Sequence, residues 1–484
     1  MTMNGAVPRG EPVARDMPEL ENGRAAPHWR GRPVWIEIDL DAVAENARRI
    51  AAWVGPGTAV MAVVKADGYG LGAAQVGTAA LAGGATWLAV ASVDEGVQLR
   101  EAGIDSPILV LGPATPWEMS RAVAARLTIT VNSVEVARAL SAAARQVRVR
   151  APVHLKLDTG LHRYGRGPDE LVALAQTLAA MPGLRLEGLY THFANAGEPD
   201  DDYATRQLDT LLDVQRQLAR LGITFALVHA ASSEGVLELA ESHLDMVRAG
   251  IMLSGHYPAP GARRPVKLVP VVTVHARIAR LLTVPAGATV GYGRTYRAPG
   301  PRTLALVPMG YADGYHRALS NRGYMLVGGR RAPVAGRVSM DQTTIDVTGI
   351  PGVREGDPVV VVGRQGKEQV SFADLAALID TIPYELLTHL NKRLPRVYLQ
   401  GGEVVQMTTL LGQVDLTLAE PLSGLPEPNG PAYAELPAIP VDLAQSWLET
   451  GDGQPLDAPE PAPRPVRRKG RVAGIRRPPR TSTE

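Results

Sequence analysis

The chain has 484 residues, of which 45% are apolar and 20% are charged, with a net charge of +1 at pH 7. This balance is typical of a globular protein and argues against an overall affinity for nucleic acid or membranes. The sequence contains no cysteine, which excludes disulfides, thiolate metal sites and cysteine nucleophiles and fits a cytoplasmic protein. The ten histidines are scattered, with no pair at metal-ligand spacing on one helix, which argues against a metalloenzyme.

Residues 59–72 form the stretch around which the chain is organised. An apolar run there ends in a single lysine, Lys65, and a glycine-rich turn. The pattern predicts a buried parallel strand that delivers one amine into a pocket. Burial lowers the pKa of such an amine and makes it available for Schiff-base chemistry. Taken by itself, the pattern fits equally well a lysine whose end reaches solvent.

The N-terminal half alternates short apolar runs with helical patterns. Residues 1–32 lack apolar periodicity and predict a disordered leader, and order begins near Trp35, with Asp41 as the expected cap of the first helix. Strands are predicted at 60–65, 87–92, 108–112, 127–132, 153–158, 186–193, 226–232 and 246–253, and helices at 93–102, 133–144, 170–180, 203–221 and 233–240. Eight strand signals separated by helices predict a (β/α)8 barrel domain over residues 33–268.

Polar residues close several of these runs. Active sites of such barrels lie at the carboxyl ends of the strands, so these residues are the candidates for chemistry. They are Lys65, Lys156, Asp158, His192, His229, Ser232, Ser233 and Arg248. Each one alone is explained as well by a solvated loop position, but five strand ends meeting on one rim favour a functional site.

The C-terminal part changes to a period of two with many turn signals. Strands are predicted at 271–278, 303–308, 324–328, 334–340, 343–347, 358–362 and 397–407, with helices at 372–379 and 384–392. They indicate a mainly antiparallel β domain over residues 269–408. Residues 409–484 are Pro-rich, acidic first and then strongly basic, which predicts a largely disordered tail with one short helix at 444–448. An anionic partner for its basic end is the less favoured alternative.

Nine short motifs follow one another over residues 33–408, namely VVKADGYG at 63–70, HLKLDTGLHR at 154–163, THF at 191–193, HAASS at 229–233, MVRAGI at 246–251, GYGRTY at 291–296, GYADGY at 310–315, RVSMDQ at 337–342 and PYE at 383–385. In this order they resemble the motifs of the alanine racemase family of pyridoxal phosphate (PLP) enzymes. Each motif alone is weak, whereas their ordered combination over two domains is specific.

The resemblance implies a role for each matching residue. Lys65 would carry the cofactor as an aldimine and serve as one catalytic base, and Tyr292 would be the other. The implied cofactor contacts are Tyr69, Ser233, Gly250, Ile251 and Tyr384 at the phosphate, Arg163 at the phenolic oxygen, His192 against the ring and Arg248 at the pyridine nitrogen. The implied substrate contacts are Arg163, Tyr311, Met340 and Asp341. Lys156 stands where relatives often carry a carbamylated lysine.

The resemblance also implies PLP-dependent interconversion of L- and D-alanine for peptidoglycan, in a head-to-tail homodimer with shared active sites. The alternatives are a serine or broader-specificity racemase, a decarboxylase of the same fold, and a non-catalytic PLP-binding protein. The decarboxylases generally use a cysteine, which this chain lacks. Three positions depart from the family pattern, namely Ser232 for Asn, Ser254 for Tyr and Ser339 for Cys, and none of them removes a proton carrier.

Overall fold

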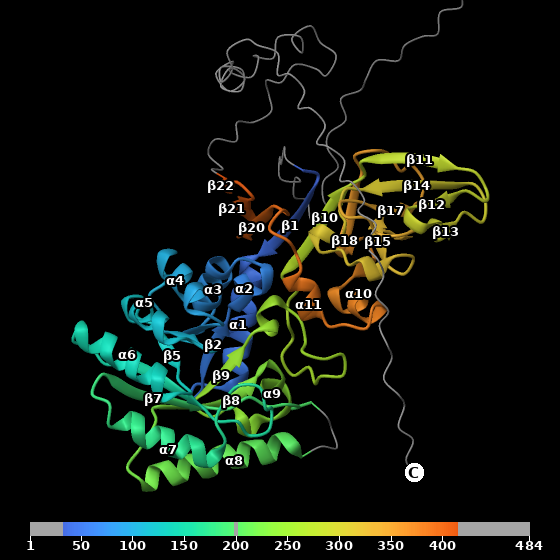
Figure 1. The fold of residues 1–484 in the computed structure, drawn as a ribbon. Coiled ribbons are helices and arrows are strands. Elements are labelled where there is room, and N and C mark those ends of the chain that lie inside the picture. The colour runs from blue at the N-terminus through green and yellow to red at the C-terminus, as the bar shows by residue number, and fades with distance from the viewer. Residues whose placement is uncertain (1–31, 198–201, 415–484) are drawn as a thin grey trace, which may run out of the picture. The chain divides into compact units, whose positions relative to one another are not determined.

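The computed structural model describes residues 32–197 and 202–414 (Figure 1). The predicted leader at 1–31, the acidic and basic segments of the tail and the short helix at 444–448 lie outside the described residues. The predicted fold class, a (β/α)8 barrel followed by a mainly antiparallel β domain, is confirmed.

Eight parallel strands close the barrel in chain order. They are β2 (Ala59–Val63), β3 (Trp87–Val90), β4 (Ile108–Val110), β5 (Thr128–Thr130), β6 (Ala151–Lys156), β7 (Leu184–Tyr190), β8 (Leu227–Ser232) and β9 (Met246–Ala249). Pairing of β2 with both β3 and β9 completes the closure. The bounds of each strand lie within four residues of the predicted ones, because buried apolar runs flanked by turn signals define parallel strands well.

Helices connect the barrel strands and cover them. They are α2 (Lys65–Gly70), α3 (Ala73–Ala82), α4 (Val93–Glu101), α5 (Met119–Ala124), α6 (Val134–Gln146), α7 (Pro168–Ala179), α8 (Tyr203–Arg220) and α9 (Ser233–Glu238). Serine side chains begin two of them, since Ser92 accepts from the Glu95 N–H at 3.3 Å and Ser133 from the Val136 N–H at 3.2 Å. These caps satisfy backbone donors that the first helical turn leaves free.

The first strand, β1 (Val34–Asp39), belongs to the sheet of the β domain, although the expected barrel domain over 33–268 included it. It pairs antiparallel with β10 (Val272–Arg277) and parallel with β20 (Arg396–Gln400), as Figure 1 shows for the blue β1 beside the yellow-green and orange strands. The cap of α1 (Leu40–Val54) is Asp39 and not Asp41 as expected, because the Asp39 carboxylate accepts from the Ala42 N–H at 3.0 Å.

The β domain contains a nine-stranded sheet and two smaller sheets. Its remaining strands are β11 (Arg280–Val284), β12 (Thr289–Val290), β13 (Tyr296–Arg297), β14 (Arg302–Val307), β15 (Tyr324–Val327), β16 (Arg330–Pro333), β17 (Thr343–Asp346), β18 (Pro358–Gln365), β19 (Glu368–Val370), β21 (Glu403–Thr409) and β22 (Gly412–Val414). Two short helices, α10 (Phe372–Leu378) and α11 (Pro383–Thr388), follow β19.

Some details of this domain differ from the predictions. Residues 334–340 form no strand and make only one isolated bridge, between Val334 and Ile345. The single strand predicted at 397–407 is the hairpin of β20 and β21, which turns at Gly401 and Gly402 with φ of 59° and 87°. The helix predicted at 384–392 ends at Thr388. Residues 409–414, expected in the tail, extend the sheet through β22.

Candidate active site

Lys65 lies at the start of a backbone turn of unusual handedness. From Ala66 to Tyr69 the φ angles are between 54° and 63° and the ψ angles between 37° and 48°, which is the left-handed helical region. That region costs L-residues roughly 1–2 kcal/mol each, so the surroundings must hold the turn in place. Glu95 does so by accepting from the Ala66 N–H at 2.8 Å.

Two further contacts fix the end of this turn. The Asp67 carboxylate accepts from the Ala73 N–H at 3.0 Å, and the Arg396 guanidinium donates to the Gly70 carbonyl at 2.9 Å. Arg396 is buried and comes from β20 of the β domain. The second domain therefore takes part in positioning the lysine of the barrel.

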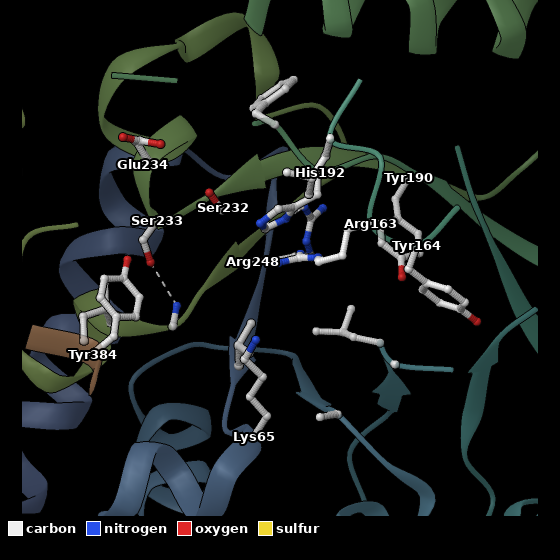
Figure 2. A pocket seen from close by; sticks show the side chains of 18 of the residues that line it. Lys65, Arg163, Tyr164, Tyr190, His192, Ser232, Ser233, Glu234, Arg248 and Tyr384 are labelled. Atoms are coloured by element: carbon white, nitrogen blue, oxygen red, sulfur yellow. Dashed lines mark hydrogen bonds between the residues drawn. The ribbon is translucent and has the colours of Figure 1, made fainter. Parts of the chain in front are cut away.

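The carboxyl ends of the barrel strands surround a cavity of about 740 Å³. Every residue predicted to contact the cofactor lines it, namely Lys65, Tyr69, Arg163, His192, Ser233, Arg248, Gly250, Ile251 and Tyr384, and so do Lys156 and Ser232. Figure 2 shows the Lys65 side chain entering from one side, with Arg248, Arg163 and His192 beyond its amine. The predicted convergence of strand ends on one rim is thus present.

The Lys65 amine is in an environment that favours its neutral form. Burial lowers its pKa first, and the positive charges of Arg163 and Arg248 lower it further, against the opposing effect of Glu95. A neutral amine is both a nucleophile and a proton acceptor, which are the two abilities that Schiff-base and acid–base chemistry require.

Arg248 is the most heavily bonded side chain of the cavity. It is buried, and its guanidinium donates to the carbonyl oxygens of Thr191 at 2.8 Å and Ala230 at 2.7 Å and to the Nδ1 atoms of His229 at 2.9 Å and His192 at 3.1 Å. Burial lowers its pKa to about 10, so it stays cationic at neutral pH. Four acceptors hold this charge in one orientation.

A line of buried groups continues from Arg248 away from the cavity. Because a guanidinium can only donate, His229 must accept through Nδ1 and carry its proton on Nε2. That proton is donated to His154 Nδ1 at 3.0 Å, and His154 Nε2 then faces the Glu187 carboxylate at 3.6 Å. Burial lowers the pKa of both histidines, which keeps them neutral in these tautomers.

Another part of the cavity wall offers polar groups suited to an anion. The Ser233 hydroxyl accepts from the Gly250 N–H at 3.0 Å, and both residues are close to Tyr69 and Tyr384 in the cavity lining. A side chain at position 250 would place its Cβ 2.3 Å from the Tyr69 hydroxyl, so only glycine fits there. Burial raises the pKa of Tyr69 to about 12 and that of Tyr384 further, so both phenols remain donors.

Lys156 is a second lysine in the same cavity, and its side chain is buried. Its Nζ lies 5.4 Å and 5.6 Å from the ring centroids of Tyr164 and Tyr190. Burial, followed by the charges of Arg248 and Arg163, lowers its pKa to about 8. A sizeable neutral fraction is therefore present at mildly alkaline pH.

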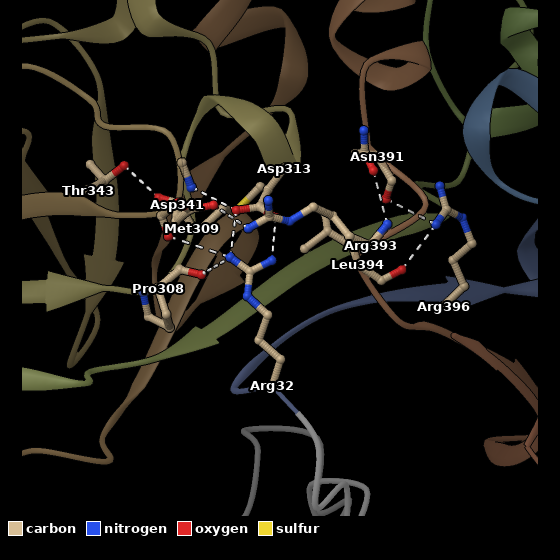
Figure 3. Close-up of polar contacts among 11 residues, drawn as sticks. Arg32, Pro308, Met309, Asp313, Asp341, Thr343, Asn391, Arg393, Leu394 and Arg396 are labelled. Atoms are coloured by element: carbon tan, nitrogen blue, oxygen red, sulfur yellow. Dashed lines mark hydrogen bonds and ion pairs between the residues drawn. The ribbon is translucent and has the colours of Figure 1, made fainter. Parts of the chain in front are cut away.

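Of the site residues predicted in the β domain, Tyr384 lines the cavity and the others lie outside its lining. Tyr292, in η4 (Tyr292–Arg294), is 73% exposed and does not line the cavity of its own chain. Tyr311 and Met340 are also exposed. Asp341 pairs with Arg393 at 2.6 Å, beside the buried carboxylate of Asp313 (Figure 3).

Several lining residues were missed by the sequence analysis. Among them are Leu111, Pro113, Tyr164, Tyr190 and Glu234. Tyr190 ends β7, so the strand-end rule could have found it, whereas Tyr164 lies in a loop, directly after the HLKLDTGLHR motif. Leu111 and Pro113 have apolar side chains that a search for polar strand ends does not select. Only the closed barrel shows that they line the cavity.

Comparison with known proteins identifies the family. The model of the alanine racemase N-terminal domain matches residues 38–258, and that of the C-terminal domain matches residues 271–398. Alanine racemase of Symbiobacterium thermophilum is 44% identical, over 77% of this chain and 98% of the relative. That of Desulfosudis oleivorans is 43% identical, over 76% of this chain and 97% of the relative. The chain belongs to the alanine racemase family.

Solved structures of the same family agree with this membership. Alanine racemase of Bacillus anthracis with bound L-Ala-P is 36% identical, with a TM-score of 0.74 over 80% of this chain and 99% of that chain. The complex of alanine racemase from Clostridium difficile 630 with cycloserine is 32% identical, with a TM-score of 0.73 over 78% of this chain and 99% of that chain. The resemblance drawn from the nine motifs is thereby confirmed.

Two of the three departures from the family motifs have a visible setting. Ser232 lines the cavity, where its smaller side chain stands in place of an amide. Ser254 is buried and donates to the Ile251 carbonyl at 2.7 Å, outside the cavity lining. In the part of the chain that the structure describes, no helix combines the length and apolar character needed to cross a bilayer.

Proposed function

We propose that this alanine racemase family member interconverts L- and D-alanine with PLP, using Lys65 and Tyr292 as its two acid–base groups. The observation on which the proposal rests is the Lys65 amine in the lining of the barrel cavity, with a pKa lowered by burial and by Arg163 and Arg248. Family membership supports it, since the curated relatives are named alanine racemases.

The cavity suits a pyridoxal phosphate on chemical grounds. Position 250 admits no side chain beside the Tyr69 hydroxyl, and its N–H and the Ser233 hydroxyl face the same wall, which fits a phosphate. We assign the phosphate to Tyr69, Ser233, Gly250, Ile251 and Tyr384. Lys65 would hold the cofactor covalently, and Arg163, His192 and Arg248 would contact its ring. When bound, PLP supplies the electron sink for a proton leaving Cα.

The acid–base work is divided between two faces of the substrate. On one face the Lys65 amine accepts the α-proton, and its protonated form returns one. Tyr292 does the same on the other face, where its phenolate needs stabilising charge. We assign that charge to Arg248, and His192, whose Nδ1 accepts from Arg248 at 3.1 Å, extends the polar network towards the phenol. Arg248 would also keep the ring nitrogen without a proton, because a guanidinium does not readily release its own.

The exposed position of Tyr292 is the reason for proposing a homodimer. It is 73% exposed and absent from the cavity of its own chain, so a second copy would have to supply it. We propose a homodimer in which Tyr311, Met340 and Asp341 of each chain also complete the substrate entrance of the other. The D-alanine formed would serve peptidoglycan synthesis in the cytoplasm.

The test is a racemisation assay on the purified full-length protein with PLP, using alanine, serine and lysine of both configurations. We expect alanine to react fastest, whereas equal rates with serine or lysine would indicate a broader racemase. Lys65→Ala should abolish turnover, and Lys367→Ala, an exposed lysine of the β domain, should leave it unchanged. PLP binding without turnover of any amino acid would instead support a non-catalytic PLP-binding protein.

A further inference from the structure

We propose that His316, Glu385 and His389 form a binding site for a divalent transition-metal ion, of which Zn²⁺ is the reference case. The three residues form the one group of three or more potential metal-ligating side chains found among residues 32–197 and 202–414. None of them lines the barrel cavity, so the site is separate from the proposed racemase chemistry.

The three side chains are brought together by two segments far apart in sequence. Glu385 lies on α11 and His389 caps its end, and residues four apart lie on the same helical face. His316 follows η5 (Tyr311–Asp313) and approaches from the other segment, with its Nε2 2.9 Å from His389 Nδ1. One ligand atom of each residue lies within 4.8 Å of the other two.

The backbone holds these two segments together without any ion. The Asn391 N–H donates to the Asp313 carbonyl at 3.2 Å. Gly314, with φ of 108°, packs so tightly that a Cβ there would lie 2.6 Å from the His389 carbonyl oxygen. The ligand positions are therefore set by the fold rather than by three independent surface side chains, which lowers the cost of binding an ion.

The histidine pair is arranged so that an ion can replace a proton. Its rings are nearly parallel, at 15°, and one nitrogen must donate to the other across 2.9 Å. Two nitrogens bound to tetrahedral zinc at about 2.0 Å lie about 3.3 Å apart, so the pair needs to open by about 0.4 Å. Small rotations of two side chains, one of them exposed, provide this movement.

The donor set determines the class of ion. Two imidazole nitrogens and one carboxylate suit Zn²⁺, Ni²⁺, Co²⁺ or Cu²⁺, whereas Mg²⁺ and Ca²⁺ prefer sites made of oxygen. The Thr381 hydroxyl hydrogen-bonds to Glu385 and orients its carboxylate from outside the ligand set.

An ion at this position would link α11 to the segment that follows Tyr311. Tyr384, at the start of α11, lines the barrel cavity, so the link would stiffen one part of the cavity wall from outside. Because binding to the folded chain alone stabilises it, the melting temperature should rise with Zn²⁺ concentration. This effect is independent of turnover and needs no racemase activity to be measured.

The experiment is equilibrium dialysis of the full-length, PLP-loaded protein against Zn²⁺, Ni²⁺ and Mg²⁺, with metal analysis and thermal melts. We expect one saturable Zn²⁺ or Ni²⁺ per chain and no such site for Mg²⁺. His316→Gln, His389→Gln and Glu385→Gln should each weaken that site about 10-fold or more, by analogy with the loss of groups that support a metal site. Their melting temperatures should no longer rise with Zn²⁺.

The matched control is His162→Gln. His162 is also exposed and also four residues from a carboxylate, with 3.7 Å between its Nδ1 and Asp158 Oδ2, but no third ligand joins that pair. We expect it to retain the bound ion. The proposal is overturned if the wild type binds no saturable ion, or if His316→Gln and His389→Gln bind Zn²⁺ as tightly as the wild type while folding normally. A Co²⁺ absorption spectrum that keeps its intensity in His389→Gln would overturn it as well.

Discussion

The Arg248 guanidinium donates to Nδ1 of His229 at 2.9 Å, and this single hydrogen bond sets the tautomers of two buried histidines. His229 must then donate from Nε2 to His154, whose own Nε2 proton faces Glu187. The charge at the cavity is in this way connected to a carboxylate on the opposite side of two neutral rings. The orientation of a side chain in the cavity wall thus depends on His154 and Glu187, which do not line the cavity.

His229→Leu should weaken the enzyme by misplacing Arg248. The guanidinium would lose one of four acceptors, and a hydrogen bond to a charged group contributes about 1.5–3 kcal/mol, so we expect turnover to fall roughly 10- to 100-fold. His154→Gln, one step further along the line, should have a smaller effect. Steady-state kinetics with alanine check this order, and a larger loss in His154→Gln than in His229→Leu would contradict it.

Lys156 should make stability depend on pH in a defined window. Its pKa is about 8 in the folded chain and 10.5 for an ordinary lysine, so between these pH values the unfolded state binds more protons. Stability therefore rises with pH across the window. Relative to Lys156→Met, the wild type should gain about 1–2 kcal/mol between pH about 8 and about 9.5.

Urea unfolding of both proteins in CO₂-free buffer provides the measurement, because carbamylation would remove the titrating amine. The comparison between the two proteins cancels the contributions of other groups, including Lys65. A difference in unfolding free energy that stays constant over the window would show that Lys156 titrates normally. Parallel ¹³C NMR with labelled bicarbonate should reveal a carbamate signal in the wild type that Lys156→Met lacks.

The barrel was predictable because the sequence patterns that indicate its strands are local. Runs such as 108–112 and 127–132 are short, apolar and bounded by turns, and each became a strand. Polar residues at their ends then followed from the general position of barrel active sites. The rule that barrel active sites lie at the carboxyl ends of the strands is enough to predict Lys65, His192 and Arg248, without any family motif.

The predictions that were wrong concern contacts between residues distant in sequence. Nothing within 34–39 shows that β1 pairs with β10 and β20 rather than opening the barrel. The hairpin at Gly401 and Gly402 lies inside an otherwise continuous strand pattern. The pair of His316 and His389 was invisible to a search for histidines spaced along one helix, because the chain brings them together from 73 residues apart.

Arg393 should stabilise the β domain through two carboxylates (Figure 3). Its guanidinium pairs with the fully buried Asp313 at 2.8 Å and with Asp341 at 2.6 Å, while Arg32 bonds the other side of Asp313 at 2.7 Å. Losing one partner of a buried charge typically costs about 3–5 kcal/mol, and because Arg32 remains we expect about 1–3 kcal/mol for Arg393→Ala.

Chemical unfolding measures this loss, with Arg393→Lys as the control that keeps the charge but not the two-pronged geometry. We expect the lysine variant to fall between the wild type and the alanine variant. If Asp341 contacts substrate from the partner chain as proposed, the KM for alanine should also rise in Arg393→Ala. An alanine variant as stable as the wild type would mean that Arg32 alone suffices for Asp313.

The shared active site can be tested by mixing two inactive chains. Lys65→Ala lacks the lysine and Tyr292→Phe lacks the phenol, so a dimer of one chain of each kind would contain one site with both residues intact. After co-refolding in equal amounts, half of the dimers are mixed, and we expect about a quarter of the wild-type activity. Mixing Lys65→Ala with the double variant Lys65→Ala/Tyr292→Phe should restore none. Failure of the first mixture, despite mixed dimers shown by mass spectrometry, would mean that Tyr292 does not act across the interface.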